Sequence, residues 1–352
     1  MKNANYFVER NLKNSNQLKL LLFELPSFCD EYFRGIENTT TPLTRVGYAQ
    51  DLKIFFEFLT KEILEFIGKK IKDITLEDLG KITQTHLEIY LNYLSNYEKS
   101  GEIFSNNSRA KARKLSAVRS IFRYFYKKGK LSENVASKID TPKIRDKEIV
   151  RLEVDEVVKL LNTAENPKDF SKRQKSYNKL TKTRDIAILT LLLGTGIRVS
   201  ECVGLNIEDI DFETNGFKIT RKGGAQTVLY FSEEVATSLQ NYLKERLSNE
   251  FVSPDEHALF LSIQNKRIGV RAVEQLVKKY SQDCIPLKHI TPHKLRSTYG
   301  TNLYRETGDI YIVADVLGHR DVNTTKKHYA AISEDSRRKV ANVVKLREND
   351  ES

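Results

Sequence analysis

One stretch of the sequence, residues 105–147, combines a helical period with a strong excess of positive charge. It holds 13 Lys or Arg residues against three acids, an excess close to the net charge of +11 of the whole chain. At about 100° per residue, one arc of the helix collects five apolar side chains: Leu115, Val118, Ile121, Phe122 and Phe125. The opposite arc collects five basic ones: Arg109, Arg113, Arg119, Arg123 and Lys127. We therefore expect a helix with one core-facing side and one side that can bind phosphates, the alternative being a solvated surface helix.

Length, charge and cysteine content favour a two-domain protein with a polyanionic partner, and they argue against a membrane-spanning, secreted or disulfide-rich protein. At roughly 100–200 residues per domain, 352 residues favour two domains. The excess of 58 Lys and Arg over 47 Asp and Glu favours a polyanionic partner, although a basic chain can also lack one. No apolar run approaches the ~20 residues of a membrane span, and the first residues lack the apolar segment of a secretion signal. Three scattered cysteines exclude a disulfide scaffold and a CxxC zinc site, so we expect a cytoplasmic protein.

The first half of the chain reads as helical from about residue 18 to residue 140. Apolar residues recur at helical spacing in two segments, 48–59 and 87–94, which predicts two helices with one buried face each. Thr83 is the expected N-cap of the second helix, because threonine is favoured where a helix begins.

Turn-rich segments and one proline set the expected boundaries. Residues 37–41 and 96–107 are predicted to be turn-rich breaks between helices. Pro142 ends the helical region, because the residue before a proline disfavours helix. We therefore expect a small helical domain, 1–144, followed by an exposed basic linker, 145–152.

The second half, 153–352, is predicted to be helical with one small sheet. Helical patterns cover four segments: 153–161, 185–193, 235–247 and 270–280. The polar, Lys-rich segment 162–182 is predicted to be a surface loop or short insertion. Residues 217–221 and 227–231 are typical of two strands joined by a glycine turn. The fold class is therefore mainly α with a small antiparallel β-sheet.

Four short motifs in this half could carry chemistry, and the sequence holds no phosphate loop, dinucleotide-binding loop or HExxH zinc motif. In GTGIRVSE, a helix that ends in two glycines can aim Arg198 into a cleft, and Glu201 is close enough to hold that side chain. Lys222 lies at the tip of the expected hairpin, where a flexible ammonium group can reach a substrate. Taken singly, a structural ion pair and a solvated lysine are the ordinary interpretations of these residues.

The other two motifs bring histidine, arginine and tyrosine. In TPHKLRST, a proline suits the first helical turn, so His293 and Arg296 share one face and can contact one phosphate. In LGHRDVNTTKKHYA, His319 can donate to a phosphate oxygen and Tyr329 can act as a covalent nucleophile. His289 lies four residues before His293, but no Asp, Glu or Cys is placed near this pair as an obvious third ligand, so we expect no metal site.

The succession of these motifs closely resembles that of the tyrosine recombinases. Arg in GTGIRxSE, a hairpin Lys, HxLR, LGH and then Tyr follow in that order over about 130 residues. RKLSAVRSIFRYFYKKG resembles the family's core-binding domain, which is a DNA-binding domain. TRKGG, the ALFL segment and VEQLVKKYS look most like the Xer-type proteins of Gram-positive bacteria that act without a second paralogue.

The resemblance implies a role for each motif residue. Four residues would bind the scissile phosphate: Arg198, His293, Arg296 and His319. Lys222 would be the general acid for the leaving 5′ oxygen, Tyr329 the nucleophile that forms a 3′-phosphotyrosine, and Glu201 the support of Arg198. Tyr329 lies one residue further from His319 than in many Xer proteins, and His328 occupies the shorter spacing; a phenol is chemically required, so Tyr329 is the expected nucleophile.

The resemblance also implies an assembly. It predicts a C-shaped, two-domain clamp on double-stranded DNA, with residues 153–352 as the catalytic domain and no metal, ATP or other cofactor. A C-terminal helix, 333–347, with an apolar stripe would insert into a neighbouring protomer and build a homotetramer on two DNA sites. The need for a DNA translocase as activator stays open.

Two biological roles share this chemistry: resolution of chromosome dimers, which the Xer-like segments favour, and integration or excision of a mobile element. Two further classes differ in activity. One is a DNA-binding regulator that kept the fold and lost catalysis, and the other is a type IB topoisomerase, which relaxes DNA without exchanging strands.

Overall fold

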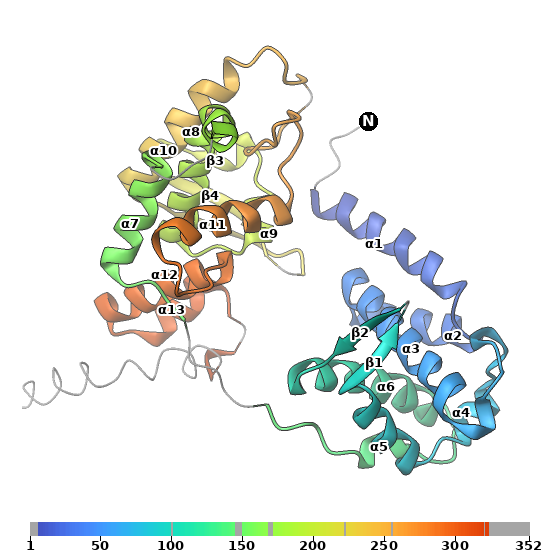
Figure 1. Ribbon diagram of the computed structural model, residues 1–352. Coiled ribbons are helices and arrows are strands. Elements are labelled where there is room, and N and C mark those ends of the chain that lie inside the picture. Colours follow the sequence, from blue (N-terminus) through green and yellow to red (C-terminus); the bar gives the residue numbers. More distant parts are fainter. Residues whose placement is uncertain are drawn as a thin grey trace, which may run out of the picture. The chain divides into compact units, whose positions relative to one another are not determined.

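The computed structural model describes residues 6–99, 101–144, 150–167, 172–221, 223–254, 256–319 and 321–323. The chain divides into two compact units, residues 1–147 and 148–352, and the division falls within the linker expected at 145–152. Figure 1 shows the elements of each unit, and each unit is described here by itself.

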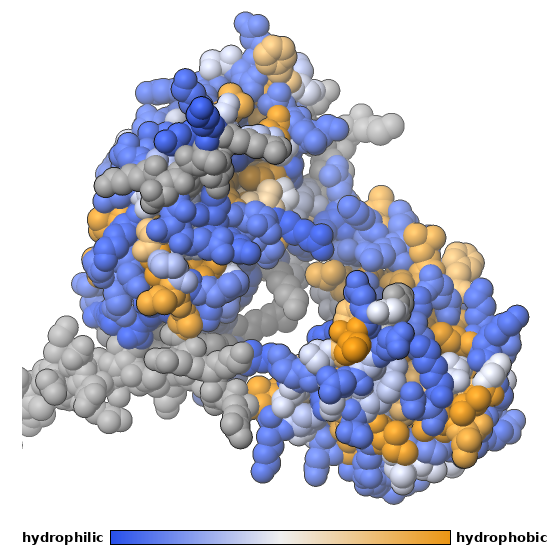
Figure 2. Space-filling view, in the orientation of Figure 1, coloured by the Kyte–Doolittle hydropathy of each residue, from blue (hydrophilic) through white to orange (hydrophobic). Residues whose placement is uncertain are grey.

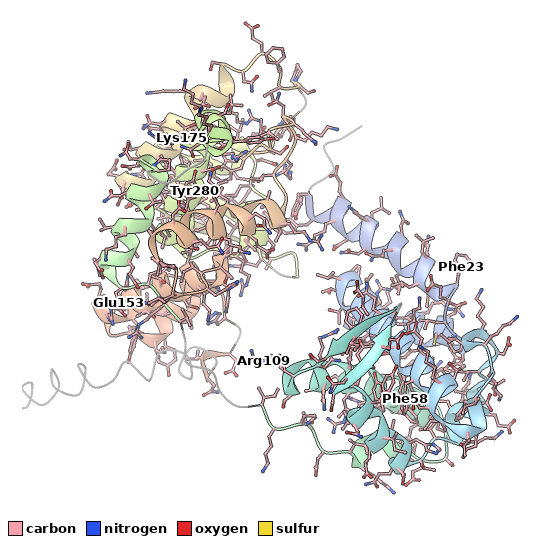
Figure 3. All side chains as sticks on the ribbon, viewed as in Figure 1. Phe23, Phe58, Arg109, Glu153, Lys175 and Tyr280 are labelled. Carbon is pink, nitrogen blue, oxygen red and sulfur yellow. The ribbon has the colours of Figure 1, made fainter. Side chains whose placement is uncertain are left out.

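Unit 1 is a helical domain built around its longest helix. Its helices are α1 Tyr6–Leu22, α2 Phe28–Gly35, α3 Pro42–Glu62, α4 Leu76–Gly80, α5 Gln84–Tyr93 and α6 Ser108–Lys127. α3 contacts both α1 and α6, so it buries side chains on two faces. The core is rich in aromatic rings: Phe55 and Tyr90 pack edge to face with centroids 5.1 Å apart, and Phe58 lies inside the unit (Figure 3).

Local sequence signals explain where these helices begin. Thr83 accepts a hydrogen bond from the His86 backbone N–H, 3.3 Å away, and so caps α5 as predicted. Thr41 caps α3 in the same way through Thr44, and Pro42 stands at the first helical position, where a missing N–H costs nothing.

The segment 96–107, predicted to be a turn-rich break, was interpreted wrongly. It forms a hairpin of β1 Asn96–Lys99 and β2 Glu102–Ser105, with Tyr97 opposite Phe104 and their rings stacked 5.7 Å apart. The strand signal is weak because each strand has only four residues, half or more of them polar, and the cross-strand ring pair stabilises the hairpin. Among the described residues, unit 1 therefore holds a small antiparallel sheet that was not expected, in addition to the expected sheet in the second half of the chain.

Unit 2 surrounds one long helix. Its helices are α7 Val154–Glu165, α8 Lys172–Thr195, α9 Val199–Cys202, α10 Glu233–Leu247, α11 Val270–Cys284, α12 Pro292–Thr307 and α13 Ile310–Leu317. Its strands are β3 Ile210–Asp211, β4 Gly216–Thr220 and β5 Gln226–Tyr230, in the order β3-β4-β5. α8 packs against α7, α10 and α12, and α13 packs beside α12 (Figure 1).

The predicted hairpin of unit 2 is confirmed: β4 and β5 pair antiparallel with Phe217 opposite Leu229. The prediction of a loop over 162–182 is wrong, because α7 continues to Glu165 and α8 begins at Lys172. Lys, Gln and Arg are good helix formers, so polar composition did not prevent a helix there. A buried polar network also anchors this extension to α11, since the Tyr280 hydroxyl hydrogen-bonds Asn178 at 2.7 Å and Asp185 at 3.0 Å.

The expected fold class, mainly helical with small antiparallel strands, is thus confirmed. Figure 2 shows that most of the surface in view is hydrophilic in both units, with apolar side chains in scattered patches. Among the residues that the structure describes, no helix is long and apolar enough to cross a membrane. The expected C-terminal helix 333–347 lies outside the described residues.

Candidate active site

Arg198 is held by Glu201 at the start of α9. The backbone N–H of Arg198 donates to one carboxylate oxygen of Glu201 at 2.8 Å, and its Nη1 donates to the other at 2.9 Å. Glu201 is buried, whereas the Arg198 side chain keeps 34% of its surface exposed. A buried carboxylate therefore fixes a guanidinium group that still reaches solvent, which suits a cation that must meet a ligand.

Arg296 lies on α12 and is anchored by backbone carbonyls. Its Nη1 donates to the Gly196 oxygen at 2.7 Å, and its Nη2 donates to the Leu317 oxygen. The residue is only 5% exposed. His293 stands one turn earlier on the same face of α12 and is exposed, as the i, i+3 spacing predicts.

His319 follows the end of α13, where the other motifs converge. Gly318 ends α13 in a left-handed conformation (φ 60°), and the His319 backbone N–H donates to the Ala314 oxygen at 2.9 Å. Arg198 Nη2 donates to the Gly318 oxygen at 3.2 Å. We call this cluster the arginine corner: Arg198, Glu201, Arg296, Gly318 and His319. Three motifs that lie up to 120 residues apart in the chain thus meet in one place.

The sequence analysis missed one residue at the arginine corner, Arg221. It is 8% exposed, and its Nη2 donates to the Val316 oxygen at 2.8 Å. Burial lowers the pKa of Arg221, the Glu201 carboxylate opposes that shift, and the Arg198 charge adds to it. Strand alternation could have revealed this residue, because Phe217, Ile219 and Arg221 are buried in turn along the first hairpin arm.

Lys222 and Tyr329, the expected general acid and nucleophile, lie outside the described residues. Their roles therefore stay predictions. Within the described ranges, no three His, Cys, Asp or Glu side chains are grouped as a metal site would require.

The five basic residues predicted on α6 fall into two groups. Arg109, at the start of α6 (Figure 3), Arg123 and Lys127 are exposed. Arg113 is also exposed but pairs with the buried carboxylate of Asp51. Burial raises the pKa of Asp51 above its usual value, and the charge of Arg113 offsets part of that rise. Arg119 donates to the carbonyl oxygens of Ala136 and Ile139, so its guanidinium secures the segment that follows the helix.

Beside α6 lies a groove with a cavity volume of about 600 Å³, which we call the α6 groove. Its lining holds no acid. Apart from Ile36, the lining residues are basic or carry a hydroxyl: Thr39, Thr40, Tyr48, Ser116, Arg119, Ser120, Arg123, Tyr124 and Lys127. Hydroxyl and guanidinium groups are the usual donors to phosphate oxygens, so the α6 groove can accept a polyanionic backbone.

Residues 150–335 match the model of the phage integrase family, and this match spans more than half of the chain. The chain belongs to the phage integrase family. Its curated relatives are named tyrosine recombinases, so this chain is a tyrosine recombinase. The XerC protein of Caldanaerobacter subterraneus subsp. tengcongensis is 34% identical over 304 residues, covering 84% of this chain and 79% of that protein. The XerS protein of Lactococcus lactis subsp. lactis is 28% identical over 361 residues, covering 95% and 99%.

Two solved structures show the same fold. XerH recombinase bound to a palindromic difH substrate has a TM-score of 0.65 at 19% identity, and the match covers 97% of this chain and 91% of that one. A lambda integrase tetramer bound to a Holliday junction has a TM-score of 0.60 at 16% identity, covering 86% and 76%.

Proposed function

We propose that this recombinase cleaves and rejoins double-stranded DNA at a specific site through a 3′-phosphotyrosine and a Holliday junction. The Tyr329 oxygen attacks the scissile phosphorus, the bond from phosphorus to the 5′ oxygen breaks, and Lys222 gives a proton to that oxygen. The observation that carries this proposal is the convergence of Arg198, Arg296 and His319 at the arginine corner. His293 joins them as a further donor to the phosphate.

The arginine corner suits this chemistry because its donors are fixed before the substrate arrives. A phosphodiester repels nucleophiles, and its transition state concentrates negative charge on the oxygens. Guanidinium groups held by Glu201 and by backbone carbonyls stabilise that charge without reorganising. The phenol of Tyr329, with an ordinary pKa near ~10, must lose its proton to attack, and nearby cations favour the phenolate. Bond energy is kept in the phosphotyrosine, so rejoining requires no ATP.

Unit 1 supplies DNA affinity in this proposal. The α6 groove and the exposed Arg109, Arg123 and Lys127 bind backbone phosphates, which gives salt-dependent affinity with little sequence information. Arg113 and Arg119 belong to the same predicted set, but their contacts with Asp51 and with backbone carbonyls assign them mainly to the structure of unit 1.

The proposed assembly is a homotetramer on two DNA sites, joined by the expected C-terminal helix 333–347. The tetrameric lambda integrase supports this assembly, and the whole-length match to XerS supports resolution of chromosome dimers as the biological role. The proposal includes a cytoplasmic location, and the need for a DNA translocase as activator stays open. Integration or excision of a mobile element is the competing role.

A nicked suicide substrate carrying the dimer-resolution site of the source genome tests the proposal. Wild-type protein and Tyr329→Phe are incubated with it in EDTA, and protein–DNA adducts that resist denaturation are measured. We expect an adduct from the wild type alone. Binding without an adduct from either protein would favour an inactive regulator, and absence of both binding and adduct would favour a mobile-element site.

A further inference from the structure

Arg221 connects the expected general-acid hairpin to the arginine corner. Its backbone N–H donates to the Ala225 oxygen at 2.7 Å, and its own oxygen accepts from Gly224 at 3.0 Å, so the turn between β4 and β5 closes at this residue. Its side chain donates to the Val316 oxygen of α13. One residue therefore links the hairpin turn to α13, the helix that precedes His319.

The contact of Arg221 with Gly318 is unusually close. A Cβ atom placed on Gly318 would stand 2.5 Å from Nη1, 2.6 Å from Cζ and 2.8 Å from Nε of Arg221. Gly318 also has φ +60°, which L side chains rarely adopt. Gly318 therefore has two structural roles. It terminates α13, and its lack of a side chain allows the Arg221 guanidinium to pack against the backbone next to His319.

Burial of this guanidinium requires a reason. Arg221 stands beside the charge of Arg198, and among the described residues its Nη1 is buried with no hydrogen-bond partner. A buried cationic donor without all its hydrogen-bond partners lowers the stability of the fold, and an apolar residue of similar size would avoid this desolvation penalty. The contacts of this buried guanidinium with the hairpin turn and with α13 point to a role in the reaction.

We propose that Arg221 is a positioning residue, which fixes the start of the turn so that Lys222 meets the phosphate held by the arginine corner. Lys222 is bonded directly to Arg221, and the next two residues, Gly223 and Gly224, have φ of 101° and 90°. A turn with such glycines is intrinsically adaptable, so the anchored residue before Lys222 limits where its ammonium group can lie. This inference rests on the proposed role of Lys222 as general acid.

The test compares two leaving groups in single-turnover cleavage of the suicide substrate. One substrate carries the normal 5′ oxygen at the scissile phosphate, and the other carries a bridging 5′ sulfur. With sulfur, the bond from phosphorus to sulfur breaks and the thiolate departs without a proton. A defect in the general acid therefore does not slow cleavage of this substrate. Rates of adduct formation are measured for wild type, Lys222→Ala and Arg221→Met.

We expect Lys222→Ala to be slower on oxygen by about 10²–10⁴-fold and to recover on sulfur. Arg221→Met should be slower on oxygen by about 10²-fold, as for a misplaced catalytic group, and should also recover on sulfur. The matched control is Arg246→Met on α10: Arg246 is 7% exposed and donates to the carbonyls of Ala258 and Glu256. It should lose thermal stability without changing the ratio of the two rates.

The outcomes separate this inference from the function on which it rests. If Arg221→Met stays slow on sulfur while Lys222→Ala recovers, Arg221 acts on the phosphate or on the fold, and the inference alone is overturned. If Lys222→Ala also stays slow on sulfur, or if wild type forms no adduct on either substrate, the proposed function fails as well. Should Arg221→Met not fold, Arg221→Lys keeps the charge and must show the same selective recovery on sulfur.

Discussion

α6 in unit 1 and the arginine corner in unit 2 both gather arginines, but they hold them differently. On α6, Arg123 is exposed, on the side opposite an apolar face in the core. At the arginine corner, Arg296 is buried and two backbone carbonyls fix its guanidinium, while Glu201 fixes Arg198. The first arrangement leaves the charge free to follow a flexible polyanion, and the second sets donors at defined points.

This difference separates affinity from catalysis. Exposed cations gain affinity largely by releasing counterions from DNA, which depends on charge and weakly on geometry. Stabilisation of a transition state depends on donors that need not reorganise, so geometry dominates. Substitutions at the arginine corner should therefore affect the cleavage rate, and those at the exposed Arg123 and Lys127 of α6 should affect DNA binding.

The largest effect is expected for Arg296→Lys. Lysine keeps the positive charge but cannot donate to the Gly196 and Leu317 oxygens while facing a phosphate, because its ammonium group is a single point. Adduct formation on the suicide substrate should fall about 10³-fold. DNA affinity, measured by gel shift on the same substrate, should stay close to that of wild type. A large loss of affinity with an unchanged cleavage rate would reverse the assignment.

Glu201→Gln should have a smaller effect on the same rate. Glu201 accepts one hydrogen bond from the Arg198 backbone and one from the Arg198 side chain, each on a different carboxylate oxygen. Glutamine has only one oxygen and no charge, so it cannot reproduce both contacts. The Arg198 guanidinium then loses its fixed orientation, and adduct formation should slow about 10²-fold. A thermal melt distinguishes this from unfolding. A rate equal to that of wild type would show that Glu201 does not orient Arg198.

Arg119→Met should mainly reduce stability. The guanidinium of Arg119 donates to the oxygens of Ala136 and Ile139 and to the hydroxyl of Thr141, all beyond the end of α6. Removal leaves those carbonyls to water and should cost about 1–3 kcal/mol of unfolding free energy, measured by denaturant unfolding of the full chain. The salt dependence of DNA binding should not change, and a change would place Arg119 on DNA.

The sequence predicted the helical framework well because apolar periodicity and caps act locally. The Thr83 cap and the β4–β5 hairpin each depend on a few neighbouring residues. The extension of α8 could not be predicted in this way, because its buried Asn178 and Asp185 are satisfied by Tyr280, about 100 residues away. A polar segment was therefore interpreted as a loop when tertiary hydrogen bonds make it a helix.

The arginine corner could be anticipated from motif order, but the division of labour among basic residues could not. Helical angle places Arg119 and Arg123 on one face of α6, yet Arg119 turns to backbone carbonyls that follow the helix. Strand alternation places Arg221 on the buried face of its strand, but its partner could not be predicted, because the Val316 oxygen is 95 residues away and a backbone carbonyl leaves no trace in side-chain spacing. Helical periodicity predicts the face of the helix on which a side chain lies, whereas its hydrogen-bond partners depend on tertiary contacts.

The smallest effect, and the finest test of the contrast between the two regions, is expected for Arg123→Ala. Arg123 is exposed and lines the α6 groove, so its loss should remove about one phosphate contact. The slope of log K against log salt concentration should then decrease in magnitude by about 0.9, with a modest loss of affinity at low salt. Lys127→Ala should behave alike, because it lines the same groove. Arg119 also lines the groove, but its guanidinium donates to the Ala136 and Ile139 oxygens, so Arg119→Met is the matched control on the same helix and should leave the slope unchanged. If Arg123→Ala left the slope unchanged, the α6 groove would not contact the DNA backbone, and the affinity of unit 1 would have to come from another face.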